Sequence, residues 1–448
     1  MLTNEEKTVY IIHTIDTEGP LYEPIEATFE RLYDLFGIKL VATRENLIKL
    51  QNKQIDFGEN TNVITDVFNP HYLQYNDTWD KIDNMLINVM SSEFRNEVLD
   101  SFGNGWIYNW HCVDHVDYMY NPRRRDIGVH NIFDHYRKMV KDTGSNNDGM
   151  HWHFHPMSVY KEAHRCASSF INSPHLYEIL CRRVIERNWF PVVSRAGFQV
   201  ERPDSHWFLE QWIPFDPSNW AYREENDADD CQTDIAGGRS GDWRLAPDDW
   251  SIYQPSHDNY QLPGNCRRWI CRSLDIMTRA RELTQDEVDK AFTRANGCKA
   301  TIMGITNHDF RDMAYEVNFA REKIVKASEK YPDVKFKFCE AVDGFRSAIY
   351  GTDNTGDSVE LDVSLQKDSE RLLLKVETVQ GEVFGPQPFL AVKTKSERFI
   401  HDNFDFDTSL TKWTYTFDYD SIHAEDVSAI GVATNDKYGN TFIKVLNL

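Results

Sequence analysis

Two acidic residues separated by one position stand near the start of the chain, in the segment 14–19 (TIDTEG). They follow an apolar run that predicts a strand, and side chains at i and i+2 of a strand share a face. Asp16 and Glu18 could therefore divide two tasks, one binding a metal ion and the other accepting a proton from water. An acid pair of this spacing is common, and by itself it also suits a solvated surface.

Three histidines alternate with aromatic residues in the segment 151–155 (HWHFH). In a strand all three imidazoles point to one side, whereas in a helix His151 and His155 still share a face. Either geometry can present two ring nitrogens to one cation, at the ~2.0–2.1 Å typical of zinc sites. Metal binding is the favoured interpretation, and a half-buried strand with a polar face is the alternative.

Two further polar positions close apolar runs. Arg195 ends one run and could orient a catalytic carboxylate through a bidentate pair, although structural salt bridging is an equal alternative. His308 ends another run beside Asp309, and an imidazole there could protonate a departing amine. Whether Asp309 or another acid would orient His308 is left open. All these positions lie at or just beyond the carboxyl ends of predicted strands, where α/β folds place their sites.

Short apolar runs alternate with helical patterns from the N-terminus to about residue 350. Strands are predicted over 8–16, 105–113, 150–155, 190–195, 300–307 and 334–339, and helices over 25–37, 131–141, 174–187 and 284–295. This alternation is typical of an α/β architecture with a largely parallel sheet. Residues from about 221 to 265 are polar and aperiodic, which indicates a long insertion near a functional mouth or a surface excursion.

The pattern changes after residue 350. Residues 351–357 are predicted to be a linker, and from 358 to 448 apolar and polar residues alternate in short segments separated by turn-forming clusters. Strands are predicted there over 359–365, 372–379, 389–392, 413–417, 430–433 and 441–445. Short strands at close intervals favour a small all-β sandwich. The 448 residues thus divide into two domains, as their number leads us to expect.

Composition argues against some classes of partner. The net charge is −22, and both nucleic acids and anionic membrane surfaces are bound by clustered Lys and Arg. No apolar stretch is long enough to cross a membrane and no signal peptide is recognisable, so a cytoplasmic location is expected. The eight cysteines are scattered without a paired spacing, which predicts buried free thiols.

The order of the four motifs resembles that of the polysaccharide deacetylases of carbohydrate esterase family 4. That family opens with Thr-x-Asp, similar to 14–18 here, and continues with His-x-x-x-His, similar to 151–155. An arginine motif follows, which 195–197 resembles, and then a histidine after an apolar strand, which His308 resembles. The resemblance implies a distorted (β/α)7-type barrel for residues 1–350, an α/β fold, and it does not extend to 358–448.

The resemblance also implies a role for each motif. Asp16 would be the general base, His308 the general acid, and Arg195 the residue that tunes Asp16. Three residues would bind a divalent metal ion, expected to be Zn²⁺: Glu18, His151 and His155. His153 would support these ligands or replace one of them.

The implied activity is removal of an N-acyl group, acetyl or formyl, from an amino sugar or sugar nucleotide in surface-polysaccharide biosynthesis. The substrate would be a small molecule or an oligosaccharide, and a homo-oligomer is compatible with the sequence. One alternative is an amidohydrolase acting on a C–N bond outside carbohydrates. Another is a saccharide-binding or assembly protein without turnover, although binding alone needs no base and acid.

Basic residues indicate where a charged substrate would bind. Arg123, Arg124 and Arg125 are consecutive and could grip a phosphate or carboxylate, as in a nucleotide sugar or an anionic saccharide. A structural ion-pair cluster is the more common reason for such a run. A second candidate patch holds Arg268 and Trp269.

Overall fold

The first strand of the chain lies at the centre of the main sheet. The computed structural model describes residues 6–116, 119–155, 170, 173, 175–222, 241–278, 282–351, 354–368 and 371–448. Strand β1 (Thr8–Thr17) is buried at all ten positions, which is why it appears in the sequence as a continuous apolar run. It pairs in parallel with β2 (Tyr108–Val113) and β7 (Thr301–His308).

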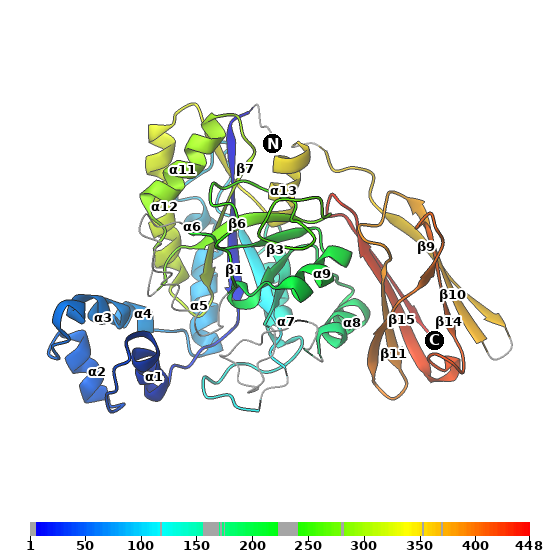
Figure 1. Ribbon diagram of the computed structural model, residues 1–448, viewed down its shortest axis with the longest axis horizontal. Coiled ribbons are helices and arrows are strands. Elements are labelled where there is room, and N and C mark those ends of the chain that lie inside the picture. The colour runs from blue at the N-terminus through cyan, green and yellow to red at the C-terminus, as the bar shows by residue number, and fades with distance from the viewer. Residues whose placement is uncertain are drawn as a thin grey trace.

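Seven parallel strands form a nearly closed barrel (Figure 1), in the order β4-β3-β2-β1-β7-β6-β5. The other four are β3 (Gly149–Phe154), β4 (Ser194–Ala196), β5 (Phe215–Asn219) and β6 (Trp269–Asp275). A parallel bridge between Val193 and Phe215 joins the two ends of the sheet. An eighth strand, β8 (Lys335–Phe338), pairs with the first half of β1. Because these strands are parallel, their carboxyl ends meet at one rim.

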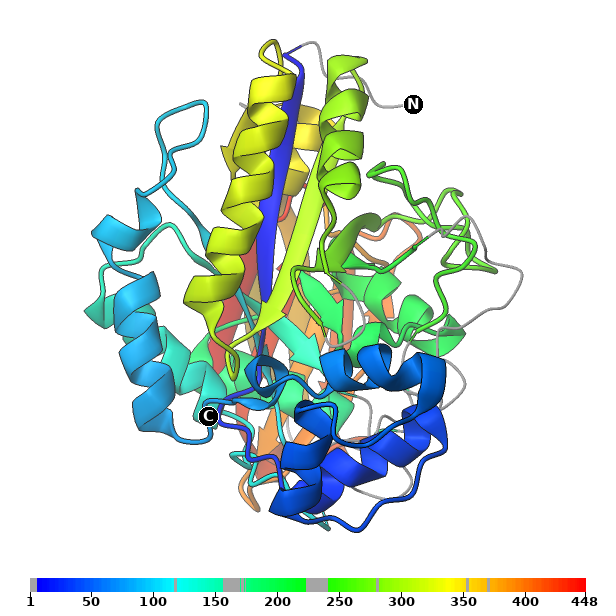
Figure 2. The same cartoon turned by 90° about the vertical axis from the view of Figure 1, so that its left-hand side faces the viewer.

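Helices cover the outside of the barrel. They are α5 (Trp79–Val89), α6 (Ser92–Arg95), α7 (Asn131–Asp142), α8 (Leu176–Arg187), α9 (Pro203–Trp212), α11 (Gln285–Asn296), α12 (Met313–Lys330) and α13 (Ala341–Tyr350). Figure 2 shows α11 and α12 side by side over β1. Polar caps begin several of them: the Thr284 hydroxyl, for example, accepts a hydrogen bond from the Glu287 amide at the start of α11.

Two apolar clusters lie on opposite faces of β1. The larger packs Val9, Ile11 and Ile15 against the outer helices. The other holds Tyr10 and Ile12 together with side chains of α13, β5 and β7. Since side chains alternate along a strand, Asp16 shares the face of Tyr10 and Ile12. The face that carries Asp16 is therefore apolar towards α13 and polar towards the rim.

A small helical lobe follows β1 and has its own core. It comprises α1 (Ile25–Phe36), α2 (Arg44–Gln51), the 3-10 turn η1 (Gly58–Asn60), α3 (Thr61–Val67) and α4 (Pro70–Leu73). Phe29, Leu32 and Ile64 are among the buried residues of that core. In Figure 1 the lobe projects beside the rim end of β1. This lobe accounts for part of the long interval between Glu18 and His151.

The C-terminal part consists of two four-stranded antiparallel sheets with the orders β13-β14-β10-β9 and β12-β11-β15-β16. Their strands are β9 (Glu360–Asp368), β10 (Arg371–Gln380), β11 (Phe389–Thr394), β12 (Phe399–Asp402), β13 (Asp405–Phe406), β14 (Lys412–Phe417), β15 (Val427–Asn435) and β16 (Thr441–Asn447); the turn η3 spans Ala424–Asp426. Both sheets contribute to one apolar cluster, in which Leu374 of β10 and Ile430 of β15 are fully buried. On the barrel side, α8 packs against β11 and β12.

Every strand and helix predicted from the sequence has a counterpart in the structure, but the prediction was incomplete. The helices α2 to α6, α9, α12 and α13 were not predicted. Strands β5 and β6 were not predicted, because 215–219 (FDPSN) contains proline and polar residues and 269–275 (WICRSLD) contains arginine. The segment predicted as a strand over 190–195 forms a strand only at Ser194–Ala196. The short β12 and β13 were also not predicted.

The segment 241–265, which is most of the described part of the polar insertion, contains buried aromatic residues. Trp243 and Trp250 have 0% exposed surface and belong to the main apolar cluster. Residues 223–240 of the insertion lie outside the described part of the chain. Although its sequence is aperiodic, the segment 241–265 contributes four large aromatic residues to the main apolar cluster: Trp243, Trp250, Tyr253 and Tyr260.

Six of the eight cysteines are described, and all six are free thiols, five of them buried. Cys166 and Cys231 lie outside the described residues. Within the ranges given above, no helix combines the length and the apolar character needed to cross a membrane.

Candidate metal centre

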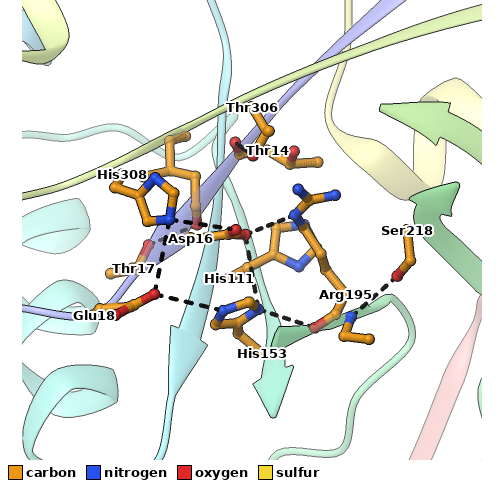
Figure 3. A network of polar contacts seen from close by, with 12 residues as sticks. Thr14, Asp16, Thr17, Glu18, His111, His153, Arg195, Ser218, Thr306 and His308 are labelled. Atoms are coloured by element: carbon orange, nitrogen blue, oxygen red, sulfur yellow. Dashed lines mark hydrogen bonds and ion pairs between the residues drawn. The ribbon is translucent and has the colours of Figure 1, made fainter. Parts of the chain in front are cut away.

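The carboxylates predicted from the sequence meet polar side chains of neighbouring strands at the rim (Figure 3). Asp16 is paired in register with His111 of β2 on one side and with His308 of β7 on the other. Glu18 follows immediately after the end of β1. Both carboxylates are almost completely buried, with 2% and 4% of their surface exposed. Buried charge of this kind requires close partners.

Three of these partners form a group that could hold a metal ion: Glu18, His153 and His155. The Glu18 Oε1 lies 3.5 Å from the His155 Nε2 and 3.9 Å from the His153 Nε2. The two imidazole Nε2 atoms are 2.9 Å apart. Ligands at ~2.0–2.1 Å on a tetrahedral centre lie about 3.3 Å from each other, so these three distances bracket the spacing that one ion needs.

His151, predicted as a ligand, does not belong to this group, and His153 takes its place. The His151 Nε2 lies 2.9 Å from the Glu340 Oε1 and 3.2 Å from the Asn109 Oδ1. The reason is geometric: residues four apart in a strand are about 13 Å apart, whereas residues two apart are about 7 Å apart. The ligand pair of an extended segment is therefore i and i+2, not the i and i+4 of a helix.

The protonation states suit a cation. Burial opposes ionisation of the Glu18 carboxyl, but the adjacent Arg125 guanidinium and His155 imidazole hold its pKa well below its usual range. Burial keeps the pKa of His153 well below its usual range, so its imidazole is neutral and has a free lone pair. The His153 Nδ1 donates to the Arg195 carbonyl at 2.9 Å, which leaves Nε2 to face Glu18.

Asp16 is held by Arg195, through one hydrogen bond and not through the bidentate pair considered from the sequence. The Arg195 Nε donates to the Asp16 Oδ1 at 2.7 Å, and its Nη1 donates to the Pro217 carbonyl at 2.7 Å. The Arg195 side chain is fully buried. A buried guanidinium with fixed partners keeps the Asp16 carboxylate oriented next to the metal group.

His308 lies on the open side of the centre. Its Nε2 is 3.8 Å from the Asp16 Oδ2 and 3.8 Å from the Glu18 Oε1. Its side chain is 23% exposed, far more than either carboxylate. Burial lowers the pKa of His308 to about 4, against the pull of Asp16 and Glu18. The imidazole is therefore neutral at pH 7 and, once protonated, would give up its proton readily.

Asp309 holds the turn after β1. Its two carboxylate oxygens accept hydrogen bonds from the backbone amides of Glu18 and Gly19 at 3.0 and 2.8 Å, and Oδ2 also accepts from the Tyr136 hydroxyl at 2.8 Å. Burial raises the pKa of Asp309 to about 7 although these donors oppose the shift. Gly19 has φ +69°, a left-handed conformation that glycine adopts without strain.

The three consecutive arginines bind the segment 18–23 of the protein itself. The Arg125 Nη2 lies 2.5 Å from the Glu18 Oε2, and the Arg123 Nη1 lies 3.3 Å from the Glu23 Oε2. The Arg124 guanidinium lies over the Tyr22 ring, 4.0 Å from its centroid. These contacts correspond to the structural ion-pair interpretation, and a substrate contact stays a prediction.

The second predicted substrate patch is not brought to the centre. The Arg268 side chain is completely buried and pairs with Asp216 at 2.5 Å and with Glu201. Trp269 begins β6 and packs against the apolar cluster on the α13 side. Arg268 therefore has a structural partner set, and its guanidinium presents no surface to a ligand.

Sequence reasoning missed several residues of the centre. His111 stands beside Asp16 in the sheet, and its alternate position within a predicted strand was the one available signal. Tyr136, on α7, is distant in sequence from the residues it orients, and no local pattern marks it. No local pattern marks Gln199 either, although it lies only a short way beyond Arg195, in the turn η2.

Comparison with known proteins adds no relative: no family model, no curated protein and no solved structure matches this chain.

Proposed function

We propose that the protein is a metal-dependent hydrolase of the polysaccharide deacetylase type, which removes an acetyl or formyl group from the nitrogen of an amino sugar or sugar nucleotide. One observation carries this proposal. Asp16, fixed by Arg195, lies beside the Glu18–His153–His155 group, and His308 is 3.8 Å from both carboxylates. A base, a set of metal ligands and a part-exposed imidazole on one rim are the parts that amide hydrolysis requires.

The ligand set fits Zn²⁺. One carboxylate and two imidazoles form one of the ligand combinations of catalytic zinc, and three protein ligands leave a position open. A divalent ion there would polarise the acyl oxygen and lower the pKa of water. Its two histidine ligands come from one strand end and its carboxylate from the strand two places away in the sheet.

The side chains of the protein would move the proton. Asp16 accepts the proton of the attacking water, because it is buried, oriented by Arg195 and has Oδ2 directed towards the open side. The proton passes to His308 and then to the nitrogen that leaves the acyl carbon. The C–N bond breaks, a C–O bond forms, and the products are a carboxylic acid and a free amine.

Two features support a sugar substrate and the deacetylase-type fold. The four motifs occur in the order that this family shows, although the group that could hold a metal contains His153 and His155, two residues apart, and not the pair four residues apart of the family motif. The nearly closed barrel of seven parallel strands agrees with the (β/α)7-type barrel expected from the resemblance. We further propose that the two C-terminal sheets, which share one apolar cluster, form a β-sandwich.

Acid release by the metal-loaded protein tests the proposal. UDP-N-acetylglucosamine, N-acetylglucosamine oligomers and an N-formylated amino sugar are incubated with Zn²⁺-loaded protein, and acetate or formate is measured. We expect release from at least one of them, and none from the metal-free protein. A fully metal-loaded protein that releases no acid from any of these, but hydrolyses simple non-carbohydrate amides, would replace the sugar substrate with another amide.

A further inference from the structure

A short loop after Arg195 has an unusual backbone. The turn η2 (Gly197–Gln199) contains two consecutive non-glycine residues in the left-handed region, Phe198 at φ 52° and Gln199 at φ 50°. Such residues are uncommon and persist where the surroundings impose the conformation. Strained backbone of this kind often lies next to functional groups.

The loop touches a metal ligand with two of its residues. A Cβ on Gly197 would lie 2.3 Å from the His155 Cδ2, so only glycine leaves room for this imidazole. The Phe198 ring meets the His155 ring edge to face, with centroids 5.0 Å apart. The His155 imidazole is therefore held between these two residues and the other ligands.

Gln199 reaches the arginine that holds the proposed base. In the amide orientation that satisfies both ends, its Oε1 accepts from the Arg195 Nη2 at 2.8 Å, and its Nε2 donates to the Phe198 carbonyl at 3.1 Å. Together with the contacts to Asp16 and Pro217, this bond gives all three guanidinium nitrogens of Arg195 a partner. One loop thus contacts both halves of the centre.

A segment of the insertion holds the loop in place. The Gly241 amide donates to the Phe198 carbonyl at 3.2 Å, and the Trp243 indole Nε1 donates to the Gln199 carbonyl at 2.9 Å. A Cβ on Gly241 would lie only 1.7 Å from the Gln199 carbonyl oxygen. Trp243 is itself fully buried, against the Tyr260 ring.

We propose that the segment 241–243 is a clasp that positions the metal centre. Trp243 and Gly241 impose the left-handed turn at Phe198 and Gln199, and the turn sets the orientation of His155 and of Arg195. Trp243 and Gln199 are then positioning residues, because neither touches the cation or the substrate. The consequence for catalysis rests on the proposed function, whereas the consequence for metal geometry does not.

Co²⁺ binding alone tests the clasp, and Trp250 supplies a matched control. Trp250 is also fully buried in the main apolar cluster, and its indole Nε1 donates to the Glu287 carbonyl at 2.8 Å. Trp250→Phe therefore removes an indole hydrogen bond to a backbone carbonyl, as Trp243→Phe does, but that carbonyl does not belong to the turn η2. We expect Trp243→Phe to weaken Co²⁺ binding about 10- to 100-fold and to shift the visible absorption band of the bound ion. Trp250→Phe should leave both unchanged. Equal behaviour of the two variants would overturn the clasp.

Two further variants separate the two contacts of the loop, that of Phe198 with His155 and that of Gln199 with Arg195. Phe198→Leu removes the ring contact with His155 from a half-buried position and should shift the Co²⁺ band even if Trp243→Phe fails to fold. Gln199→Asn tolerates the left-handed backbone but is too short to reach Arg195. It should lower kcat about 10-fold with KM and Co²⁺ affinity unchanged. An unshifted band in Phe198→Leu would contradict the role of Phe198 in orienting His155. An unchanged kcat in Gln199→Asn would contradict the role of Gln199 in orienting Arg195.

The two proposals fail in different ways. If the wild type binds Co²⁺ but releases no acyl group from any substrate, the proposed function fails, and the comparison of Trp243→Phe with Trp250→Phe still decides the clasp. A wild type that binds no Co²⁺ overturns both.

Discussion

Arg195 and Arg268 are two of the buried arginines that hold carboxylates, and of these two only Arg195 lies at the candidate centre. We call Arg195 with Asp16 the rim pair, and Arg268 with Glu201 and Asp216 the inner cluster. Both guanidinium groups have 0% exposed surface. Burial and ion pairing are thus the same in the two regions, and neither distinguishes a functional site from a structural one.

The difference lies in what remains open beside each pair. In the inner cluster Arg268 also contacts the His206 Nδ1 at 2.8 Å, and no metal-binding group is found near it among the described residues. Burial raises the pKa of Glu201 well above its usual range, against the pull of Arg268. In the rim pair the Asp16 Oδ2 faces the part-exposed His308 and the metal group. A buried ion pair becomes a candidate site when one of its oxygens faces ligands and solvent.

The largest expected effect concerns the base of the rim pair. Asp16→Asn should lower kcat about 10²- to 10⁴-fold, because an amide cannot accept the proton of water. Its Zn²⁺ content, measured by elemental analysis, should stay that of the wild type. Asp216→Asn is the matched change in the inner cluster, and the kcat of its folded molecules should equal that of the wild type. Full activity in Asp16→Asn with metal bound would remove the proposed base.

Breaking the inner cluster should affect stability instead. Arg268→Met leaves the buried Glu201 and Asp216 without their cation, which should lower the free energy of unfolding by about 3–5 kcal/mol. Urea unfolding followed by circular dichroism measures the change. Zn²⁺ affinity of the folded variant should equal that of the wild type. If Arg268→Met instead lowers the affinity for metal or for substrate substantially and leaves the free energy of unfolding unchanged, Arg268 belongs to the substrate site, as the sequence predicted.

The two histidines of β3 sharpen the comparison within the rim. His153→Ala removes a ligand and should weaken Zn²⁺ binding by more than about 100-fold, the upper end for residues that only support ligands. His151→Ala loses the contacts to Glu340 and Asn109 and should change the affinity far less. Competition with a chromophoric chelator measures both. If His151→Ala weakens Zn²⁺ binding more than His153→Ala does, the ligand pair is His151 and His155, as predicted from the sequence.

The smallest expected effect concerns the arginine behind the ligand carboxylate. Arg125→Gln should weaken Zn²⁺ binding about 10- to 100-fold, because the Glu18 Oε2 loses the cation that orients it. Arg123→Gln is the control, since Arg123 pairs with Glu23 and does not contact a ligand. Equal metal affinity in both variants would mean that Arg125 serves another purpose, such as binding an anionic substrate.

Much of the centre was predictable from the sequence, because its residues are attached to strands. Asp16, Arg195 and His308 each follow an apolar run, and in a parallel barrel the ends of such runs meet at one rim. The choice between His151 and His153 was not predictable. It depends on whether the segment 151–155 is extended, and the strand β3 decides in favour of residues two apart.

The same contrast applies to the fold. The alternation of strands and helices predicted a largely parallel sheet, but β5 and β6 were not predicted because buried polar residues interrupt their apolar pattern. Arg272 in β6, for example, is fully buried and pairs with Glu287 on α11. A strand whose polar residue has a distant partner cannot be recognised from its own composition.

By itself, then, the sequence determined which residue types stand at strand ends and in what order, since local pattern and alternation fix both. The tertiary structure decided which of them meet. It brings His153, and not His151, into the group that could hold a metal ion. It also directs Asp309 towards the backbone of Glu18 and Gly19 and buries Arg268 in the inner cluster. The physical reason is that distances of 2 to 4 Å between side chains depend on register and barrel curvature, which arise only when the whole sheet is assembled.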